Sequence, residues 1–253
     1  GASDYATKID QPSIIGAIVD LVHPDASVLV PALNEEDTIH EVIERLAAVP
    51  LNLEIIVIND GSTDGTAAIL GQVENQIKVV THAKKSGKGT AIRSGLRIAT
   101  GRVVVIQDAD LEYFPEEIPS LIAPILAGES KVVYGTRFSA GFPPGMALPN
   151  KIVNWGLALA TRILYGQKIT DEATCYKAVD TELLQSLALQ CTGFEFCPEV
   201  TAKVSRLGET IHEIPIKYVP RNKLAGKKIR WTDAPIAFWT LLRYRFWRGA
   251  GPR

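Results

Sequence analysis

Short hydrophobic runs alternate with segments of helical periodicity along about the first 110 residues. Four runs are rich in Val and Ile, as the buried strands of a parallel sheet are: 27–31 (SVLVP), 54–59 (EIIVIN), 77–80 and 102–107 (RVVVIQ). Hydrophobic residues at helical spacing occupy 38–49, 66–73 and 90–99. This strand–helix order predicts an α/β fold with a mostly parallel sheet flanked by helices, which binds ligands at the carboxyl ends of its strands.

The pattern changes after a further run at 131–135 (KVVYG). A Pro/Gly-rich loop at 141–149 precedes a predicted helix at 150–165, and 211–219 alternates as a strand does. A basic loop follows at 220–230, and the segment 234–247 predicts a helix in which bulky hydrophobic residues are interleaved with Arg. We expect a single domain at 27–219, with an N-terminal extension at 1–26 and a basic loop and amphipathic helix at 220–253.

Charge is distributed unevenly along the chain. From Lys217 onward, ten Lys or Arg residues and one Asp give a charge of +9, whereas the preceding residues carry −10. A basic segment on an acidic body indicates an anionic partner such as phosphate, nucleic acid or a membrane face, unless it is merely a solvated tail. Three cysteines without metal-ligand spacing predict reduced thiols in a cytoplasmic protein. No apolar run approaches the ~18 residues that span a bilayer, and charged residues interrupt the N-terminus, unlike a signal peptide.

Acidic residues follow the last of the four strand-like runs. Asp108 and Asp110 are two residues apart where the run RVVVIQ ends, and Glu112 follows them. Two carboxylates in such a turn can converge on a divalent cation, and oxygen ligands favour Mg²⁺ or Mn²⁺, which also binds the phosphates of a nucleoside diphosphate. The alternative is that these acids only form a turn or cap a helix.

Two other strand ends carry similar residues. The turn ALNEE (32–36) follows the first run, and DGSTDG (60–65) follows the second. Asp60 at this edge could accept hydrogen bonds from a nucleobase or ribose, although both turns also read as helix caps. Lys84, Lys85 and Lys88 form a Gly-containing basic loop before the third helix, suited to the phosphate or ribose oxygens of a nucleotide, or simply solvated.

Four motifs occur in a specific order: PALNEE, NDGSTDGT, GKGTAIRSG and QDADLEY. Together they resemble the family-two inverting glycosyltransferases of the GT-A fold, and within these the dolichol-phosphate mannosyltransferase and polyprenyl-phosphate glycosyltransferase group. Further similarities are YGTRF (134–138), TDEATCYK (170–177) and GFEF (193–196), so the resemblance covers about 27–218. The sequence departs from many members of the group in lacking their C-terminal transmembrane helices.

The resemblance implies roles for individual residues. The nucleoside pocket would comprise Pro31, Ala32, Asn34 and Glu35, with Asp60 contacting the base; Asp108, Asp110 and Glu112 would hold the metal, Glu112 standing where the group often has Gln. Arg137 and Lys151 would bind the acceptor phosphate. Arg221, Lys227 and Lys228 would belong to a loop that closes over the diphosphate. Catalysis would then rest on Asp110, Arg137, Lys151 and Arg221, and Lys88 would join Asp108 in nucleotide binding.

The expected reaction is metal-dependent, inverting transfer of a sugar from GDP-mannose or a UDP-sugar to a polyprenyl or dolichyl phosphate. A phosphate monoester has a second pKa near ~6, so it is already a dianionic nucleophile at neutral pH and needs no strong base. A soluble or other alcohol acceptor is the alternative, and it requires a carboxylate base, for which Glu195 and Asp171 are candidates.

Other function classes fit less well. A sugar nucleotidyltransferase usually has a Gly-rich, Arg-containing loop in place of PALNEE, and a non-catalytic binding module is expected to lack the acidic triplet. We expect no nucleic-acid partner. The C-terminal helix predicts either a peripheral enzyme on an anionic membrane surface, or a helix packed on the domain with its arginines in water.

Overall fold

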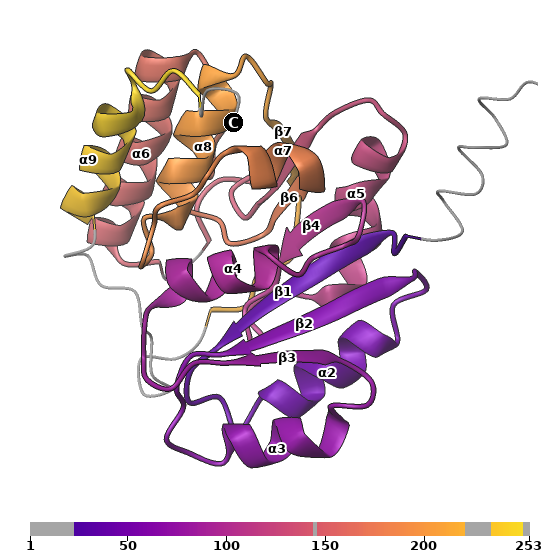
Figure 1. The fold of residues 1–253 in the computed structure, drawn as a ribbon. Helices are drawn as coiled ribbons and strands as arrows, with labels where there is room; N and C mark the ends of the chain where they lie inside the picture. Colours follow the sequence, from indigo (N-terminus) through magenta and orange to yellow (C-terminus); the bar gives the residue numbers. More distant parts are fainter. Residues whose placement is uncertain (1–22, 144–145, 221–233, 250–253) are drawn as a thin grey trace, which may run out of the picture.

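The computed structural model describes residues 23–143, 146–220 and 234–249, and its centre is a seven-stranded sheet (Figure 1). The strand order is β3-β2-β1-β4-β6-β5-β7, and β6 runs antiparallel to both of its neighbours. The strands are β1 (Ala26–Ala32), β2 (Leu53–Asn59), β3 (Lys78–Thr81), β4 (Val103–Ile106), β5 (Val132–Thr136), β6 (Lys177–Asp180) and β7 (His212–Pro215). The expected α/β fold with a mostly parallel sheet is therefore confirmed.

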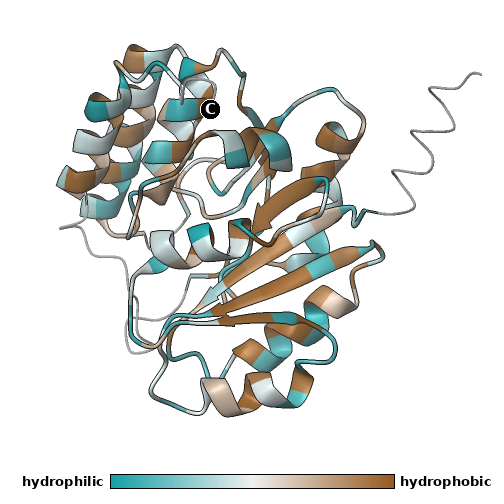
Figure 2. Cartoon of the chain, viewed as in Figure 1, coloured by the Kyte–Doolittle hydropathy of each residue, from teal (hydrophilic) through white to brown (hydrophobic). Residues whose placement is uncertain are grey.

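The central strands are buried on both faces, because their alternate residues pack against different helices. Val28 and Val30 of β1 face one hydrophobic cluster with α2 (Ile39–Ala47) and α5 (Ile118–Leu126), whereas Leu29 faces the other with α4 (Lys88–Leu96). In Figure 2, β1 and β2 are hydrophobic along most of their length. This two-sided burial explains why these strands read as continuous Val/Ile runs rather than as an alternating pattern.

The remaining helices complete the two outer layers. They are α3 (Thr66–Val73), the 3₁₀ turn η1 (Pro115–Glu117), α6 (Leu148–Tyr165), α7 (Thr181–Ser186), α8 (Phe196–Arg206) and α9 (Ala234–Tyr244). Helices α6, α8 and α9 lie side by side (Figure 1) and share a small core of Leu157, Ala202, Leu241 and Tyr244. Within the described residues, no helix combines the length and the hydrophobicity needed to cross a bilayer.

The C-terminal helix packs on the domain through one side only. Leu241 and Tyr244 are buried, whereas Ile236 and Trp239 are exposed by 53% and 64%. Packing on the domain and contact with a membrane are thus compatible for this helix, because it uses one face for packing and leaves a hydrophobic face in solvent. The basic segment 221–233 that precedes α9 lies outside the described residues.

Candidate active site

The turns that follow β1 and β2 are hydrogen-bonded to each other. Asn34 has a φ of 53°, a left-handed conformation that Asn tolerates well. Its side-chain Oδ1 accepts a hydrogen bond from the Thr63 amide at 2.8 Å, and its own amide donates to the Ser62 hydroxyl at 3.0 Å. The adjacent parallel strands thus present PALNEE and NDGSTDGT as one surface, with Pro31 and Ala32 at the end of β1. Glu35 is buried beside Thr66, to whose hydroxyl its amide donates at 2.9 Å.

Asp60, which was expected to contact the base, organises the basic loop between β3 and α4. It is buried, and its carboxylate accepts hydrogen bonds from the amides of Ser86 and Gly87, both at 2.8 Å. The Nδ1 atom of His82 lies 2.7 Å from the same carboxylate. Asp60 therefore holds this loop against the ends of β1 and β2. The sequence analysis gave no role to His82, whose partner stands 22 positions earlier.

Lys88, at the first position of α4, contacts the acidic motif directly. Its ammonium group pairs with Asp108, lies 3.0 Å from the Cys175 sulfur and faces the Phe194 ring at 5.8 Å. Burial alone would lower the pKa of Lys88, but the negative charge of Asp108 outweighs burial and raises this pKa well above its ordinary value. Lys88 therefore lies at the acidic motif and is held there by its ion pair with Asp108.

The carboxylates of Asp108, Asp110 and Glu112 do not form a closed three-ligand cage. Asp110 accepts a hydrogen bond from the Glu112 amide at 3.2 Å, whereas Glu112 accepts one from the Tyr218 hydroxyl at 2.8 Å. Across the described part of the chain, no three His, Cys, Asp or Glu side chains are grouped to hold a metal ion. A phosphate-bridged Mg²⁺ or Mn²⁺ needs only one or two protein carboxylates, because the substrate supplies further oxygens. The donor set of Asp108 and Asp110 fits such an ion.

Arg137 follows β5 and forms a two-point ion pair with Asp171. Nε and Nη2 of Arg137 each lie 2.7 Å from a different oxygen of Asp171, and the Arg137 amide donates to the same carboxylate at 3.0 Å. The guanidinium also stacks on the rings of Phe138 and Tyr218, at 5.0 and 5.1 Å. Burial would lower the pKa of Arg137, but the charge of Asp171 raises it well above its ordinary value. Arg137 is thus a fixed positive charge.

The two candidate bases are both engaged elsewhere. Asp171 has no solvent exposure and is bound to Arg137. Glu195 accepts hydrogen bonds from the amides of Thr192 and Gly193, and although burial would raise its pKa, these bonds lower it. A carboxylate held in this way is a poor proton acceptor. Both carboxylates are therefore already engaged within the protein.

The other expected acceptor residues are less closely tied to this site. Lys151 lies in the first turn of α6 and is half-buried; among the described residues its side chain forms no hydrogen bond or ion pair with the surroundings of Arg137. Arg221, Lys227 and Lys228 lie outside the described residues. Tyr218, absent from the sequence-based site, contacts both Glu112 and Arg137. The alternating pattern at 211–219 predicts a strand, but it gives no signal that Tyr218 contacts the acidic motif.

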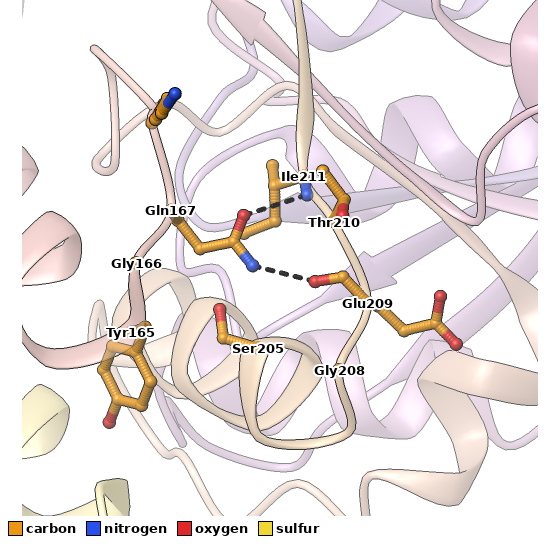
Figure 3. A pocket seen from close by; sticks show the side chains of 9 residues that line it. Tyr165, Gly166, Gln167, Ser205, Gly208, Glu209, Thr210 and Ile211 are labelled. Atoms are coloured by element: carbon orange, nitrogen blue, oxygen red, sulfur yellow. Dashed lines mark hydrogen bonds between the residues drawn. The ribbon is translucent and has the colours of Figure 1, made fainter.

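A cavity of about 410 Å³ lies elsewhere, between the end of α6 and the residues that follow α8 (Figure 3). The Gln167 side chain crosses it, donating to the Glu209 carbonyl at 2.8 Å and accepting from the Ile211 amide at 3.1 Å. None of its lining residues belongs to the site at the carboxyl ends of β1, β2 and β4. The Gln167 amide is already used in joining the two segments, so the cavity adds nothing to that site.

Comparison with known proteins agrees with this geometry. The model of the family described as Glycosyl transferase family 2 matches residues 27–187. A dolichol-phosphate mannosyltransferase from Pyrococcus furiosus is 30% identical over 212 residues, which are 80% of this chain and 60% of that protein. An undecaprenyl-phosphate mannosyltransferase from Micrococcus luteus is 26% identical, over 84% of this chain and 93% of that protein. The chain thus spans less than two thirds of the Pyrococcus relative.

Solved structures place the fold in the same group. Glucosyl-3-phosphoglycerate synthase from Mycobacterium tuberculosis superposes with a TM-score of 0.70 at 26% identity, covering 92% of this chain and 85% of that one. Its complex with Mn²⁺, uridine diphosphate and glucosyl-3-phosphoglycerate superposes with a TM-score of 0.69 at 25% identity, covering 93% and 83%. The family model covers well over half of the chain and includes the strand ends that form the site, so this protein belongs to glycosyl transferase family 2.

Proposed function

We propose that this protein transfers a sugar, with inversion, from a nucleoside-diphosphate sugar to a polyprenyl phosphate at a membrane surface. The donor half of the proposal rests on the paired turns after β1 and β2 and on the acidic motif after β4. A divalent ion held by Asp108 and Asp110 would stabilise the charge that develops on the departing diphosphate. The complex of glucosyl-3-phosphoglycerate synthase with Mn²⁺ and uridine diphosphate supports this half.

The acceptor half rests on Arg137. Its guanidinium pairs with Asp171 through Nε and Nη2, and the described residues give no hydrogen-bond partner to Nη1. That edge can bind a phosphate oxygen, because guanidinium N–H groups match phosphate geometry. A dianionic phosphate needs positioning and charge stabilisation rather than a base, in agreement with the engagement of Asp171 and Glu195. These features suit a phosphate acceptor better than an alcohol.

The proposal that the acceptor is a lipid phosphate rather than a soluble one depends on a hydrophobic face of α6 and α9. This face is the observation on which the proposed function mainly rests. We call it the α6–α9 face. Trp155 and Trp239 are exposed by 60% and 64%, and both helices show hydrophobic residues in Figure 2. Its other exposed hydrophobic members are Leu148, Ile152, Leu159, Ile163, Ile236 and Leu242, and the exposed Phe246 follows directly after α9.

The charge of these helices indicates what covers the face. Neither helix contains Asp or Glu, whereas α6 contains Lys151 and Arg162, and α9 contains Arg243. Tryptophan and aliphatic residues beside cationic side chains are typical of helices in the interface of an anionic bilayer. A protein rarely exposes this many large hydrophobic side chains on two packed helices without a function for them. We therefore infer that the α6–α9 face rests on the membrane that holds the acceptor.

A panel of acceptors tests the function. The protein is incubated with Mn²⁺, GDP-mannose or UDP-sugars, and one of three acceptors: a short polyprenyl phosphate, the matching polyprenol, or phosphoglyceric acid. We expect product with the polyprenyl phosphate alone. Arg137→Ala should raise the KM for that acceptor about tenfold or more while leaving the KM for the donor unchanged, because one charge-assisted hydrogen bond contributes roughly 1.5–3 kcal/mol. Arg97→Ala, at an exposed arginine after α4, is the control.

Either of two results would contradict the proposal. Glycosylation of the polyprenol at the same rate would mean that the phosphate is not the nucleophile. Transfer only to phosphoglyceric acid would mean that the protein shares the acceptor of its structural neighbours rather than that of its named relatives.

A further inference from the structure

Tyr218 and Val219, which follow β7, are both hydrogen-bonded to Glu112 of the acidic motif. Tyr218 uses its side chain, and Val219 uses its backbone. The Tyr218 hydroxyl donates to Oε2 of Glu112 at 2.8 Å, and the amide of Val219 donates to the Glu112 carbonyl at 3.0 Å. Glu112 is thus held at both its side chain and its main chain. The two segments are 106 residues apart in sequence, so this is a tertiary contact rather than a turn.

The ring of the same tyrosine contacts the acceptor side of the site. The Arg137 guanidinium carbon lies 5.1 Å from the Tyr218 ring centroid, within cation–π range. The Tyr113 ring packs on Tyr218 at 5.3 Å between centroids, which restricts rotation of the ring.

We propose that Tyr218 is a positioning residue that sets Glu112 and Arg137 in a fixed relation, so that the donor diphosphate and the acceptor phosphate are aligned for in-line displacement. The proposal rests on the function proposed above. It follows from the two ends of one rigid side chain: the hydroxyl contacts the acidic motif, and the ring face contacts the acceptor arginine. Displacement requires the reacting atoms to be about 3–3.5 Å apart and in line, and a misplacement of ~1 Å can reduce the rate about 100-fold.

Two substitutions of Tyr218 separate the contact of its hydroxyl with Glu112 from the contact of its ring with Arg137. Tyr218→Phe keeps the ring over Arg137 but removes the hydroxyl from Glu112, whereas Tyr218→Leu removes both contacts. Tyr165→Phe is the matched control, because its hydroxyl also forms a hydrogen bond, to the Leu241 carbonyl, but contacts neither Glu112 nor Arg137. Thermal unfolding of all three variants identifies any that fail to fold.

Binding of Mn²⁺ in the presence of uridine or guanosine diphosphate is measured by titration calorimetry, which needs no turnover. Because the Glu112 amide donates to the Asp110 carboxylate at 3.2 Å, a less firmly held Glu112 should also displace Asp110. We therefore expect Tyr218→Phe to weaken Mn²⁺ binding several-fold, and to leave the acceptor KM at the level of the Tyr165→Phe control. Tyr218→Leu should weaken Mn²⁺ binding equally, raise the acceptor KM and lower kcat about 100-fold. If Tyr218→Leu does not fold, the comparison of Tyr218→Phe with the control still decides the hydroxyl contact.

Two results would overturn the proposal: Mn²⁺ binding by Tyr218→Phe that equals the control, or identical acceptor KM and kcat in the folded Phe and Leu variants. Failure of the proposed function is a different outcome, since the wild-type protein would then form no product with polyprenyl phosphate while the Mn²⁺ titration still reports on Tyr218 and Glu112.

Discussion

The Asp171 carboxylate accepts hydrogen bonds from both Nε and Nη2 of Arg137 at 2.7 Å, and this pair fixes the guanidinium that we expect to bind the acceptor phosphate. The Asp171 side chain has no exposure and that of Arg137 is 12% exposed. The geometry turns a flexible side chain into a preorganised charge. An arginine held in this way loses less rotational freedom when it binds a phosphate.

Removing the Asp171 carboxylate should therefore affect stability and acceptor binding together. Asp171→Ala leaves a buried guanidinium without its partner, and we expect a loss of about 3–5 kcal/mol in the free energy of unfolding. Urea denaturation measures this loss, and the double variant Arg137→Met/Asp171→Ala should recover part of it. A loss below 1 kcal/mol for the single variant would show that Arg137 finds another partner.

A substitution that replaces one carboxylate oxygen tests whether the acidic motif binds a metal ion. Asp110→Asn keeps the shape of the side chain but removes a charged oxygen ligand, so transfer should be abolished while the protein stays folded. Chelation of the wild-type protein with EDTA should have the same effect, and added Mn²⁺ should restore only the wild type. Transfer that persists in EDTA would exclude the ion from the reaction.

The hydrophobic pattern of the sequence predicted strands such as β2 and helices such as α3, but not helix α8. The run at 54–59 appears as β2, and the helical spacing at 66–73 matches α3. Helix α8 was not predicted, because almost all of its residues are buried and its Glu199 and Lys203 pair with each other at 2.6 Å inside the core. Polar residues that are buried in this way do not mark the exposed face of a helix, so the polar positions of α8 do not indicate which side faces the core. The strand-like segment 211–219 ends early as β7, because the chain then leaves the sheet toward Glu112.

The residues of the candidate site also divide into those that belong to a local sequence motif and those that do not. Asp60, Asp108 and Arg137 could be proposed from the sequence because they occur in local motifs at strand ends. His82 shows no such motif, and Asp171 is expected only as a base, because the contacts of His82 with Asp60 and of Asp171 with Arg137 are made by the fold alone. A single histidine or aspartate carries no signal in one sequence that would identify its distant partner.

Asp60 should contribute to nucleotide binding through the loop that it holds. In Asp60→Ala the Ser86 and Gly87 amides and His82 lose their shared acceptor, so the loop before Lys88 is no longer fixed. We expect the affinity for the free nucleoside diphosphate to fall by roughly 1–3 kcal/mol, as when a buried hydrogen-bond partner is removed. Calorimetry measures it, with Asp64→Ala in the neighbouring turn for comparison. Unchanged affinity would limit Asp60 to a structural role in the turn.

A second buried carboxylate predicts how stability depends on pH. Burial would raise the pKa of Glu54, but hydrogen bonds from Lys78, Ser27 and Thr100 outweigh it and lower the pKa to about 2 from 4.5. Because the folded pKa is depressed, this contribution is complete above pH 4.5 and is lost as the pH falls toward 2. Its size is on the order of 3 kcal/mol. Glu54→Gln should flatten the stability of the protein over this interval, as measured by urea denaturation at each pH. A parallel curve for wild type and variant would contradict it.

The α6–α9 face predicts that the protein binds anionic vesicles through Trp155 and Trp239. Deleting the C-terminal helix is a poor test, because Leu241 and Tyr244 belong to a buried cluster and their loss would disturb the fold. Point changes avoid this problem, since side chains that are mostly in solvent affect stability by only about 0.5 kcal/mol. Trp155→Gln and Trp239→Gln should therefore unfold as the wild type does.

Each of these variants should weaken binding to phosphatidylglycerol vesicles about tenfold or more, because burying a large hydrophobic side chain contributes roughly 1.5–3 kcal/mol. Sedimentation with the vesicles measures the bound fraction. Leu207→Gln is the control, since Leu207 is 45% exposed but lies after α8, outside the α6–α9 face. Salt should weaken binding only in part, because it screens the arginines beyond ~8 Å but leaves hydrophobic contact unchanged. Transfer to a short, water-soluble polyprenyl phosphate should persist in both variants. If instead both tryptophan variants bind vesicles normally but convert a wild-type dimer into a monomer, the face joins two copies of the chain and the lipid surface must be sought elsewhere.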